Sequence, residues 1–426
     1  MLHTLYVDMN SYFASVEQQL TPALRGLPVA VVPMNVDTTS VIAASYEAKQ
    51  FGIRTGTKVG EAKRLCREGS RKLGPESACE LICVEGRHDE YIRFHHRVIA
   101  AIDTVIPVER VCSIDEMACR LMGTEREPAR AVEIAGRVKR AIAERCGSQL
   151  LCSVGIAPNR FVAKIAADMK KPDGLTLIEK HELPGRLFGL DLIDLPGIGP
   201  RMRARLERAG VTSVEGLCGL DERGLGRAWG SVIGREWHFR LRGEVLHDVE
   251  RGRRTIGHSH VLSPERRSEE KARAVAVRLL TKVGTRARHL GYVADHLTLS
   301  VRYLLPRGGP AAGRGTSRWH GRGALNASCD TPALMRAFVP LWEQAPRGVF
   351  LQVGVTLHDL TPSAAVFPLF QSQHQQDRLS KAMDAINRKY GSDAVYPASM
   401  QDARKSAPRR IAFGNIPDLD VPDVEG

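Results

Sequence analysis

Apolar residues at the start of the chain follow two spacings, one typical of strands and one typical of helices. The run Leu2–Val7 predicts a strand that ends at Asp8, and residues 12–20 have apolar positions at helical spacing. A short turn separates them, in which Asn10 or Ser11 is expected to cap the helix. This order would hold a carboxylate at the edge of a sheet.

The same alternation continues through the first 178 residues. Strands are predicted at residues 28–33, 40–44, 80–84 and 150–156, and helices at 46–51, 91–106, 129–146 and 159–169. Because strands and helices alternate, we expect residues 1–178 to form one sheet covered by helices.

The second half of the chain predicts an α+β domain followed by a tail. Strands are predicted at 256–262, 297–303 and 349–357, with helices at 269–290 and 331–343. The Gly- and Arg-rich segment 306–323 is expected to be a mobile loop. Residues 361–426 are expected to be loose, with a short helix at 378–390 and a disordered acidic end.

Length and composition indicate a multidomain protein without a membrane segment. A chain of 426 residues is expected to hold about two to four domains. No apolar run approaches the roughly 20 residues that cross a bilayer, and no signal peptide pattern is present. We therefore expect a cytoplasmic protein. The nine cysteines are scattered, which favours buried thiols over a zinc site.

Positive charge is concentrated in one region. The formal net charge is +13, and residues 251–360 alone carry 18 Lys and Arg against 7 Asp and Glu. Such a region is the electrostatic footprint expected for binding phosphate backbones. A basic surface without a polyanionic partner is the alternative.

Candidate chemistry begins with two adjacent carboxylates, Asp115 and Glu116, which follow a short apolar run. A lone acidic dipeptide is ordinarily a solvated turn. Asp8 changes this interpretation, because it is a further carboxylate at the end of a predicted strand. Crowded carboxylates repel one another unless a cation neutralises them.

A second motif, Gly197-Ile198-Gly199, lies between helical patterns and resembles a helix-hairpin-helix. Glycines allow backbone N–H groups to approach a phosphate closely at a helix N-terminus. Contacts of that kind are independent of base sequence. A plain turn between two helices is the alternative.

Taken in order, the motifs resemble those of the Y-family DNA polymerases, the translesion type, and most nearly the bacterial DNA polymerase IV group. The resemblance extends from residue 2 to about residue 360 and includes residues 7–17, 45–53, 113–116, 153–159, 163–172, 195–200 and 255–258. Two features depart from that group. Lys49 replaces the usual arginine, and Asn10-Ser11 is more similar to the UmuC branch.

The resemblance implies an α+β multidomain fold shaped like a right hand. It places a palm at 1–10 and 77–178, fingers at 11–76, a helical thumb with the hairpin at 179–245, a linker at 246–254, a DNA-gripping little finger at 255–362 and a tail at 363–426. The implied activity is template-directed DNA synthesis past damaged bases, a nucleotidyl transfer without proofreading.

The resemblance also implies two Mg²⁺ ions. Asp8 and Asp115 are expected to bridge them, with Glu116 completing the primer-side site and the carbonyl of Met9 as a backbone ligand. Carboxylate and carbonyl oxygens are the ligands that such hard cations prefer. A catalytically silent adaptor that binds DNA is the alternative, and it would lack one of these acids; all three are present.

The nucleotide site is implied in the same way. Tyr46, Lys49 and Lys171 match positions that contact the triphosphate. Phe13 matches the steric gate, whose ring would exclude a ribose 2′-hydroxyl. The alternative for Phe13 is an ordinary core aromatic.

The expected partners are primer-template DNA and deoxynucleoside triphosphates. We expect the protein to be a monomer that does not associate with a membrane. The predicted DNA contacts are Gly197, Ile198, Gly199, Arg253 and Arg254. A sliding clamp is a further candidate partner, because a hydrophobic peptide in the tail ends in Leu-Phe, as the family's clamp-binding peptide does. The Gln with which that peptide usually begins is absent. The residues predicted to contact the clamp are Phe367, Leu369 and Phe370. The alternative is a tail that packs on the little finger.

Overall fold

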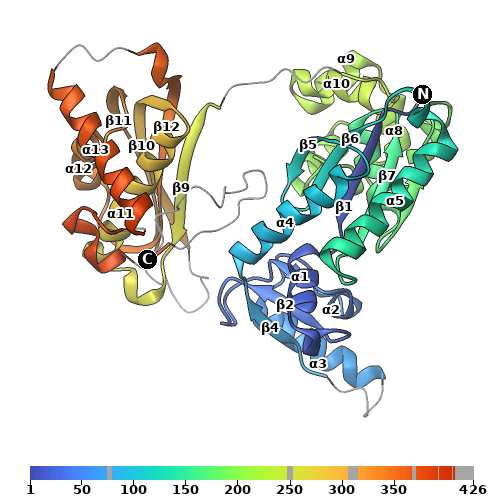
Figure 1. The fold of residues 1–426 in the computed structure, drawn as a ribbon, viewed down its shortest axis with the longest axis horizontal. Helices are drawn as coiled ribbons and strands as arrows, with labels where there is room; N and C mark the ends of the chain where they lie inside the picture. The colour runs from blue at the N-terminus through green and yellow to red at the C-terminus, as the bar shows by residue number, and fades with distance from the viewer. Residues whose placement is uncertain are drawn as a thin grey trace. The chain divides into compact units, whose positions relative to one another are not determined.

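Residues 1–73, 79–246, 253–305, 315–366, 371–391, 393–404 and 406–407 are described by a computed structural model. They separate into two units, one containing the described residues up to 246 and the other those from 253 onward (Figure 1). The division falls within the segment 246–254 that the sequence predicts as a linker.

The first unit is built on a five-stranded sheet in the order β5-β6-β1-β7-β8. Every residue of the central strand β1 is buried, as expected for a strand covered on both faces. All pairs of neighbours are antiparallel except β7 and β8. The strands are β1 (Thr4–Met9), β5 (Val108–Ser113), β6 (Glu116–Arg120), β7 (Cys152–Ala157) and β8 (Leu175–Leu177).

Three helices accompany this sheet: α4 (His88–Asp103), α5 (Pro128–Cys146) and α6 (Arg160–Met169). Helix α6 packs directly on β7 and β1. A Cβ atom at Gly155 of β7 would lie 1.9 Å from the carbonyl oxygen of Ala163 in α6. The absence of a side chain at Gly155 therefore permits the close approach of α6 to the sheet.

A second, smaller sheet contradicts the expectation of one sheet over residues 1–178. Its order is β3-β2-β4, and β2 pairs in parallel with β4. The chain connecting these two parallel strands includes helix α3, as a parallel pair requires a crossover. The apolar residues of the small sheet and of α3 pack together in a separate core. The elements are α1 (Tyr12–Leu20), β2 (Val29–Val32), β3 (Ala43–Ala44), α2 (Tyr46–Gln50), α3 (Val59–Leu73) and β4 (Ile82–Glu85).

The rest of the first unit is helical. Its helices are α7 (Pro200–Arg208), α8 (Val214–Gly219), α9 (Glu222–Trp229) and α10 (Val232–Arg240). The rings of Trp229 and Trp237 lie 4.3 Å apart, and Trp237 lies 4.7 Å from Phe161 of α6. These aromatic contacts join the helical part to the helix that covers the large sheet.

The second unit is a four-stranded antiparallel sheet in the order β11-β10-β12-β9. Helices α11 and α12 pack on the sheet, and Figure 1 shows them on one side of it. The elements are β9 (Thr255–Val261), α11 (Glu269–His289), β10 (Tyr292–Leu304), β11 (Thr316–Ser328), α12 (Thr331–Gln344) and β12 (Val349–Pro362).

The predicted mobile loop at 306–323 is wrong for residues 316–323, which belong to strand β11. Pairing with β10 outweighs the weak strand preference of their glycines. A Cβ atom at Gly321 would lie 3.1 Å from a Leu341 side-chain atom, so α12 packs closely over this strand. Residues 306–314 lie outside the described part.

The described residues between 371 and 407 are more ordered than the sequence indicates, whereas the acidic end predicted to be disordered lies outside the described part. The predicted helix at 378–390 is longer and forms α13 (Gln371–Tyr390), which is followed by η9 (Ala398–Ala403). Met400 and Ala403 are fully buried in the core of the second unit. The side chains of Arg278 on α11 and Asp393 are each 1% exposed and lie 2.5 Å apart. Arg288 pairs similarly with Asp384 at 2.6 Å.

None of the helices in the described residues combines the length and apolar character that crossing a membrane requires.

We expect Asp393→Asn to destabilise the second unit by about 3 kcal/mol, because it removes a buried carboxylate that pairs with Arg278. Asparagine tolerates the left-handed backbone of residue 393, where φ is 59°. Denaturant unfolding of the full chain, followed for the transition of the second unit, measures the effect.

The matched control is Asp377→Asn, which breaks the exposed pair with Lys381. Its effect should stay within about 1 kcal/mol. Equal losses in the two variants would contradict a special contribution from the buried pair.

Candidate active site

Three carboxylates predicted from the sequence meet at one edge of the large sheet. Asp8 of β1 lies directly opposite Glu116, the first residue of β6. Asp115 lies in the short turn between β5 and β6, and its backbone carbonyl accepts a hydrogen bond of 2.8 Å from the N–H of Met9. Strand pairing therefore brings together acids that are far apart in the sequence.

Two ammonium groups neutralise Asp8, whose carboxylate is buried. Nζ of Lys164 lies 2.6 Å from Oδ2, and Nζ of Lys171 lies 2.6 Å from Oδ1. Lys164 also lies 2.5 Å from Oε1 of Glu116, whose Oε2 accepts a hydrogen bond of 2.9 Å from Tyr6. Buried carboxylates are unfavourable without partners, so these contacts hold the acids together.

The pKa of Asp115 is raised from 3.8 to about 6, and burial is the largest cause. The hydrogen bond from Ser113, 2.5 Å between Oγ and Oδ1, acts in the opposite direction. The negative charges of Asp8 and Glu116 raise the pKa further. The neighbouring acids at this edge therefore contribute to the raised pKa of Asp115.

Both lysines remain protonated at physiological pH. Burial alone would lower the pKa of Lys164 and Lys171, but Asp8 and Asp168 outweigh it and the pKa of each is raised. Oδ2 of Asp168 lies 3.2 Å from Nζ of Lys164, and Oδ1 lies 2.8 Å from Nζ of Lys171. The cluster thus contains four carboxylates and two ammonium groups.

Lys164 and Asp168 are site residues that the sequence motifs did not assign. Their i, i+4 spacing places them on one face of α6, and Lys171 follows just beyond the helix. That spacing is a signal, but it is the same for an exposed ion pair on any helix. Asn159 caps α6 by accepting a hydrogen bond of 2.8 Å from the N–H of Val162.

The predicted triphosphate residues Tyr46 and Lys49 lie on α2. Nζ of Lys49 lies 4.3 Å from the ring centroid of Tyr46 and donates a 2.7 Å hydrogen bond to Ser11 Oγ. Burial and the charge of Lys171 lower the pKa of Lys49. Ser11 is the N-cap residue of α1, but its side chain does not cap the helix and instead binds Lys49.

Phe13 lies in the first turn of α1 and is 5% exposed. Its ring stacks on Tyr91, with centroids 4.3 Å apart and planes at 14°. The hydroxyl of Tyr91 donates a 2.7 Å hydrogen bond to Glu17, which also accepts one from Arg87 at 3.1 Å. A buried network thus fixes the ring from one side, an arrangement compatible with a gate and with a core aromatic.

The hairpin predicted to contact DNA directly precedes α7. Gly197 has a φ of 105°, which L side chains rarely adopt, and Gly199 is the N-cap residue. Arg253 and Arg254 are exposed just before β9. Ile198 does not share that exposure, because its side chain is buried. The predicted clamp contacts lie outside the described residues: Phe367, Leu369 and Phe370.

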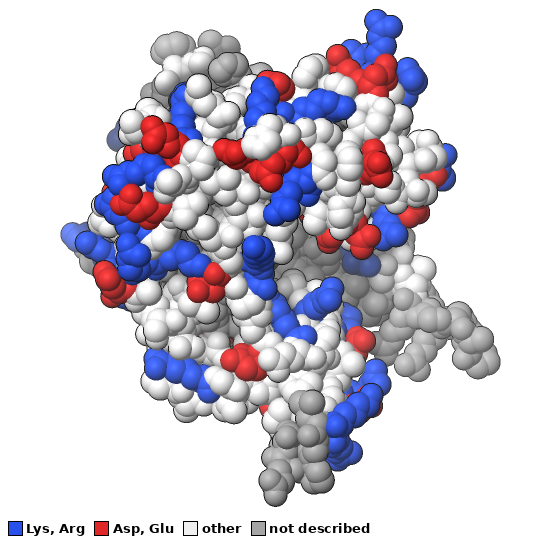
Figure 2. All heavy atoms as spheres, turned by 90° about the vertical axis from the view of Figure 1, so that its right-hand side faces the viewer, with Lys and Arg blue, Asp and Glu red and all other residues white. Residues whose placement is uncertain are grey.

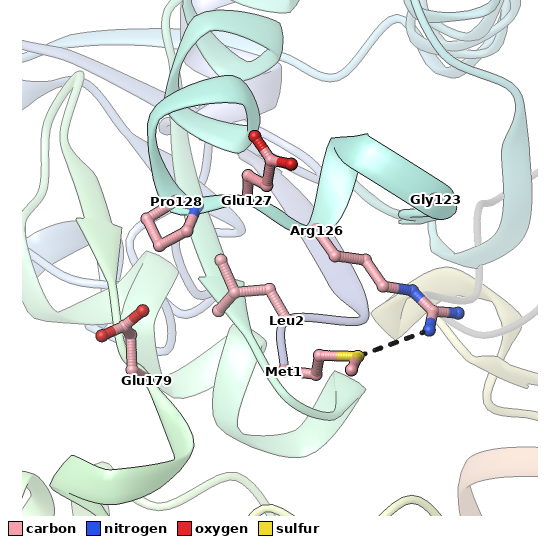
Figure 3. A pocket seen from close by; sticks show the side chains of 7 residues that line it. All are labelled: Met1, Leu2, Gly123, Arg126, Glu127, Pro128 and Glu179. Atoms are coloured by element: carbon pink, nitrogen blue, oxygen red, sulfur yellow. Dashed lines mark hydrogen bonds between the residues drawn. The ribbon is translucent and has the colours of Figure 1, made fainter.

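A separate hollow of about 350 Å³ lies at the other end of β1. Figure 3 shows Arg126 directed toward Met1, with Nη1 of the arginine 3.8 Å from the sulfur. The hollow contains none of the predicted site residues. It is lined by Met1, Leu2, Gly123, Arg126, Glu127, Pro128 and Glu179.

Comparison with known proteins gives the family. Residues 7–168 match the model of the impB/mucB/samB family, and residues 253–368 match that of its C-terminal domain. A solved Y-family DNA polymerase chimera of Dbh and Dpo4 has a TM-score of 0.65 at 22% identity, over 84% of this chain and 99% of the other. The DNA polymerase IV of Moorella thermoacetica is 33% identical over 92% of this chain and 95% of the relative. The chain belongs to the Y family of DNA polymerases.

Membership confirms the recognition made from the motifs and the α+β multidomain fold. The insertion ternary complex of Dbh DNA polymerase is another similar structure, with a TM-score of 0.56 at 22% identity over 84% of this chain and 98% of the other. This Y-family polymerase is a DNA-directed DNA polymerase of the translesion type. The family also implies dependence on a divalent metal ion.

The donor set at the sheet edge fits such an ion by its chemistry. Asp8, Asp115 and Glu116 supply carboxylate oxygens, the ligands that hard divalent cations prefer. Within the described residues, no group of three His, Cys, Asp or Glu side chains is arranged to hold a metal as it stands. The ammonium of Lys164 lies between Asp8 and Glu116 instead, at 2.6 Å and 2.5 Å. A metal at this place would have to displace that contact.

The pH dependence of stability should report the titration of Asp115. Because its pKa is raised in the folded protein, Asp115 stabilises the fold fully below pH 3.8, and this contribution is lost as the pH rises through about 6. In EDTA, Asp115→Asn should therefore be more stable than the wild type at pH 7.5, by about 1 to 3 kcal/mol. Unfolding curves between pH 4.5 and 7.5 measure this difference.

The gain should shrink toward pH 4.5, where the wild-type carboxyl is largely protonated. Ser113→Ala serves as a control for loss of the neighbouring hydrogen bond alone. A difference between Asp115→Asn and wild type that does not change with pH would contradict the raised pKa.

Proposed function

We propose that this Y-family polymerase extends primers opposite damaged and undamaged template bases without proofreading, and that Asp8, Asp115 and Glu116 carry the chemistry. The meeting of these three acids at the end of β1, with the ammonium of Lys164 between Asp8 and Glu116, is the observation that carries the proposal. Phosphoryl transfer needs positioning and charge neutralisation more than covalent participation.

In the proposed site, Asp8, Asp115, Glu116 and the backbone carbonyl of Met9 would hold two Mg²⁺ ions, with Glu116 on the primer side. When bound, the ions would activate the primer 3′-hydroxyl and stabilise the leaving pyrophosphate. The chain contributes placement, because β1 and the β5–β6 turn are fixed by pairing across the sheet. Asp8 and Glu116 lie on strands, where side chains are positioned more accurately than on loops, and Asp115 lies in a short turn between two paired strands.

The proposed triphosphate site consists of Tyr46, Lys49 and Lys171. Lys171 lowers the pKa of Lys49, so the two cations are close enough to repel each other. An anionic ligand beside them would relieve this repulsion. Similarity to a polymerase solved as an insertion ternary complex supports binding of an incoming nucleotide and of DNA. A lysine at position 49 contributes charge but not the bidentate fork of an arginine.

The second unit is the proposed grip on duplex DNA. Core residues of β10 such as Leu299 and Val301 alternate with Arg302, which pairs across the strands with Arg318 of β11. Arg322 follows Arg318 on the same face, since strand side chains alternate. These arginines therefore lie opposite the face that α11 and α12 cover, where phosphates could be contacted without reading sequence.

Further proposed phosphate contacts are the backbone at Gly197-Ile198-Gly199 and the exposed side chains of Arg253 and Arg254. Figure 2 shows a face of the molecule on which Lys and Arg are interspersed with Asp and Glu, unlike the excess of basic residues counted over 251–360. The DNA-binding proposal therefore concerns the arginine-bearing sheet face, the hairpin, and the exposed Arg253 and Arg254.

The remaining parts of the proposal concern oligomeric state, cellular location, a protein partner and domain boundaries. We propose a monomer acting in the cytoplasm, with a sliding clamp as a partner of the peptide at Phe367, Leu369 and Phe370. The domain boundaries inferred from the family, including a thumb at 179–245, belong to the same proposal.

Asp115→Ala should abolish primer extension while DNA binding survives, because the acid is needed for metal binding and not for contact with phosphates. A primer-extension assay on undamaged and lesion-bearing templates, with and without Mg²⁺, measures activity, and an electrophoretic shift measures binding. Extension at the wild-type rate would refute the metal role of Asp115.

Phe13→Ala should admit ribonucleotides, because removal of the ring opens space beside the sugar. Single-nucleotide incorporation with dNTP and rNTP pairs measures discrimination, which is expected to fall by about tenfold or more if one steric contact of about 1.4 kcal/mol or more is lost. Phe94→Ala, an aromatic deletion on α4, is the control. Unchanged sugar discrimination in Phe13→Ala would leave Phe13 as a core residue only.

A further inference from the structure

A fourth carboxylate, Asp168, adjoins the acid cluster without belonging to its predicted metal ligands. It lies on α6, one turn after Lys164 and three residues before Lys171. Its side chain is 33% exposed, whereas that of Asp8 is 5% exposed. Asp168 is therefore the more solvent-facing of the two carboxylates.

Asp8 and Asp168 share the same two ammonium groups. Lys164 Nζ lies 2.6 Å from Asp8 and 3.2 Å from Asp168. Lys171 Nζ lies 2.6 Å from Asp8 and 2.8 Å from Asp168. Each lysine can thus move toward Asp168 while remaining paired, without passing through an unpaired state in a partly buried site.

Both carboxylate oxygens of Asp8 are engaged by ammonium groups. A divalent ion that uses Asp8 must replace at least one of these contacts, because ammonium and metal repel each other and compete for the same lone pairs. The metal affinity of the cluster then depends on how favourably the displaced ammonium is received elsewhere. Asp168 is the carboxylate already in contact with both.

We propose that Asp168 is a positioning residue that receives Lys164 and Lys171 when a divalent ion takes over Asp8. The inference rests on the proposed metal role of Asp8 and Asp115. Because Lys171 is also a proposed triphosphate residue, its release from Asp8 links metal entry to nucleotide binding. Asp168 acts through the lysines and touches no reacting atom.

Asp168→Asn should weaken divalent-ion binding about tenfold, within the usual range for coupling between sites. The neutral amide receives the lysines less well, so they remain on Asp8 and compete with the ion. Binding of Mn²⁺ to the full chain, followed by electron paramagnetic resonance of the free ion, measures the affinity directly. In primer extension, the half-saturating Mg²⁺ concentration should rise while the rate at saturating Mg²⁺ recovers.

Further variants separate this role from general electrostatics and from a folding defect. Lys164→Met should bind Mn²⁺ more tightly than wild type, and Asp168→Asn should lose much of its effect in that background. Asp168→Glu should restore much of the affinity. Asp37→Asn, which removes a 69% exposed partner of Lys63 outside the site, should bind Mn²⁺ as wild type does.

The outcomes distinguish this inference from the proposed function. If Mn²⁺ binding is the same in wild type and Asp115→Ala, the proposed metal site fails and the inference falls with it. If binding depends on Asp115 but Asp168→Asn binds as wild type does, only the inference is overturned. An equal effect of Asp168→Asn with and without Lys164 would also overturn it, since Asp168 would then act by charge alone.

Discussion

Balance of buried negative charge at one sheet edge is the constraint on which the active site depends. Two unit charges 4 Å apart interact by about 4 kcal/mol at the effective dielectric constant of a protein surface, and more strongly when buried. Asp8, Asp115 and Glu116 could not remain close without cations. Lys164 and Lys171 supply positive charge within the fold, so the strands can pair normally around this cluster of acids.

The packing of helix α6 on the sheet explains why these lysines lie beside Asp8. Helix α6 approaches β7 closely at Gly155, and its partly buried Lys164 and Asp168 then lie near the Asp8 end of β1. Phe161 of the same helix contacts Trp237 in the helical part of the unit. One helix therefore connects the acids, the lysines and the neighbouring helical layer. Displacement of α6 would alter charge balance and packing together.

Local motifs could be predicted from the sequence, whereas contacts between residues far apart in the chain could not. Asp8 could be singled out because a strand pattern ends at it, and Asp115 because it adjoins Glu116 after a short apolar run. Asp168 could not, since its meeting with Asp8 depends on how α6 packs on β7. The smaller sheet was missed for the same reason, because alternation along the chain does not specify which strands pair. The strand at 316–323 was missed because glycine-rich composition indicates a loop unless its partner strand is known.

The C-terminal segment has a consequence for exchanging parts between related polymerases. The family's C-terminal domain matches only to residue 368, yet Met400 and Ala403 complete the hydrophobic core of the second unit. A chimera joined at the end of the matched domain would open that core to water and remove the carboxylate that accompanies Arg278. Ala407 belongs to the same core, so the transferable module extends at least to that residue, beyond the boundary that family similarity alone would suggest.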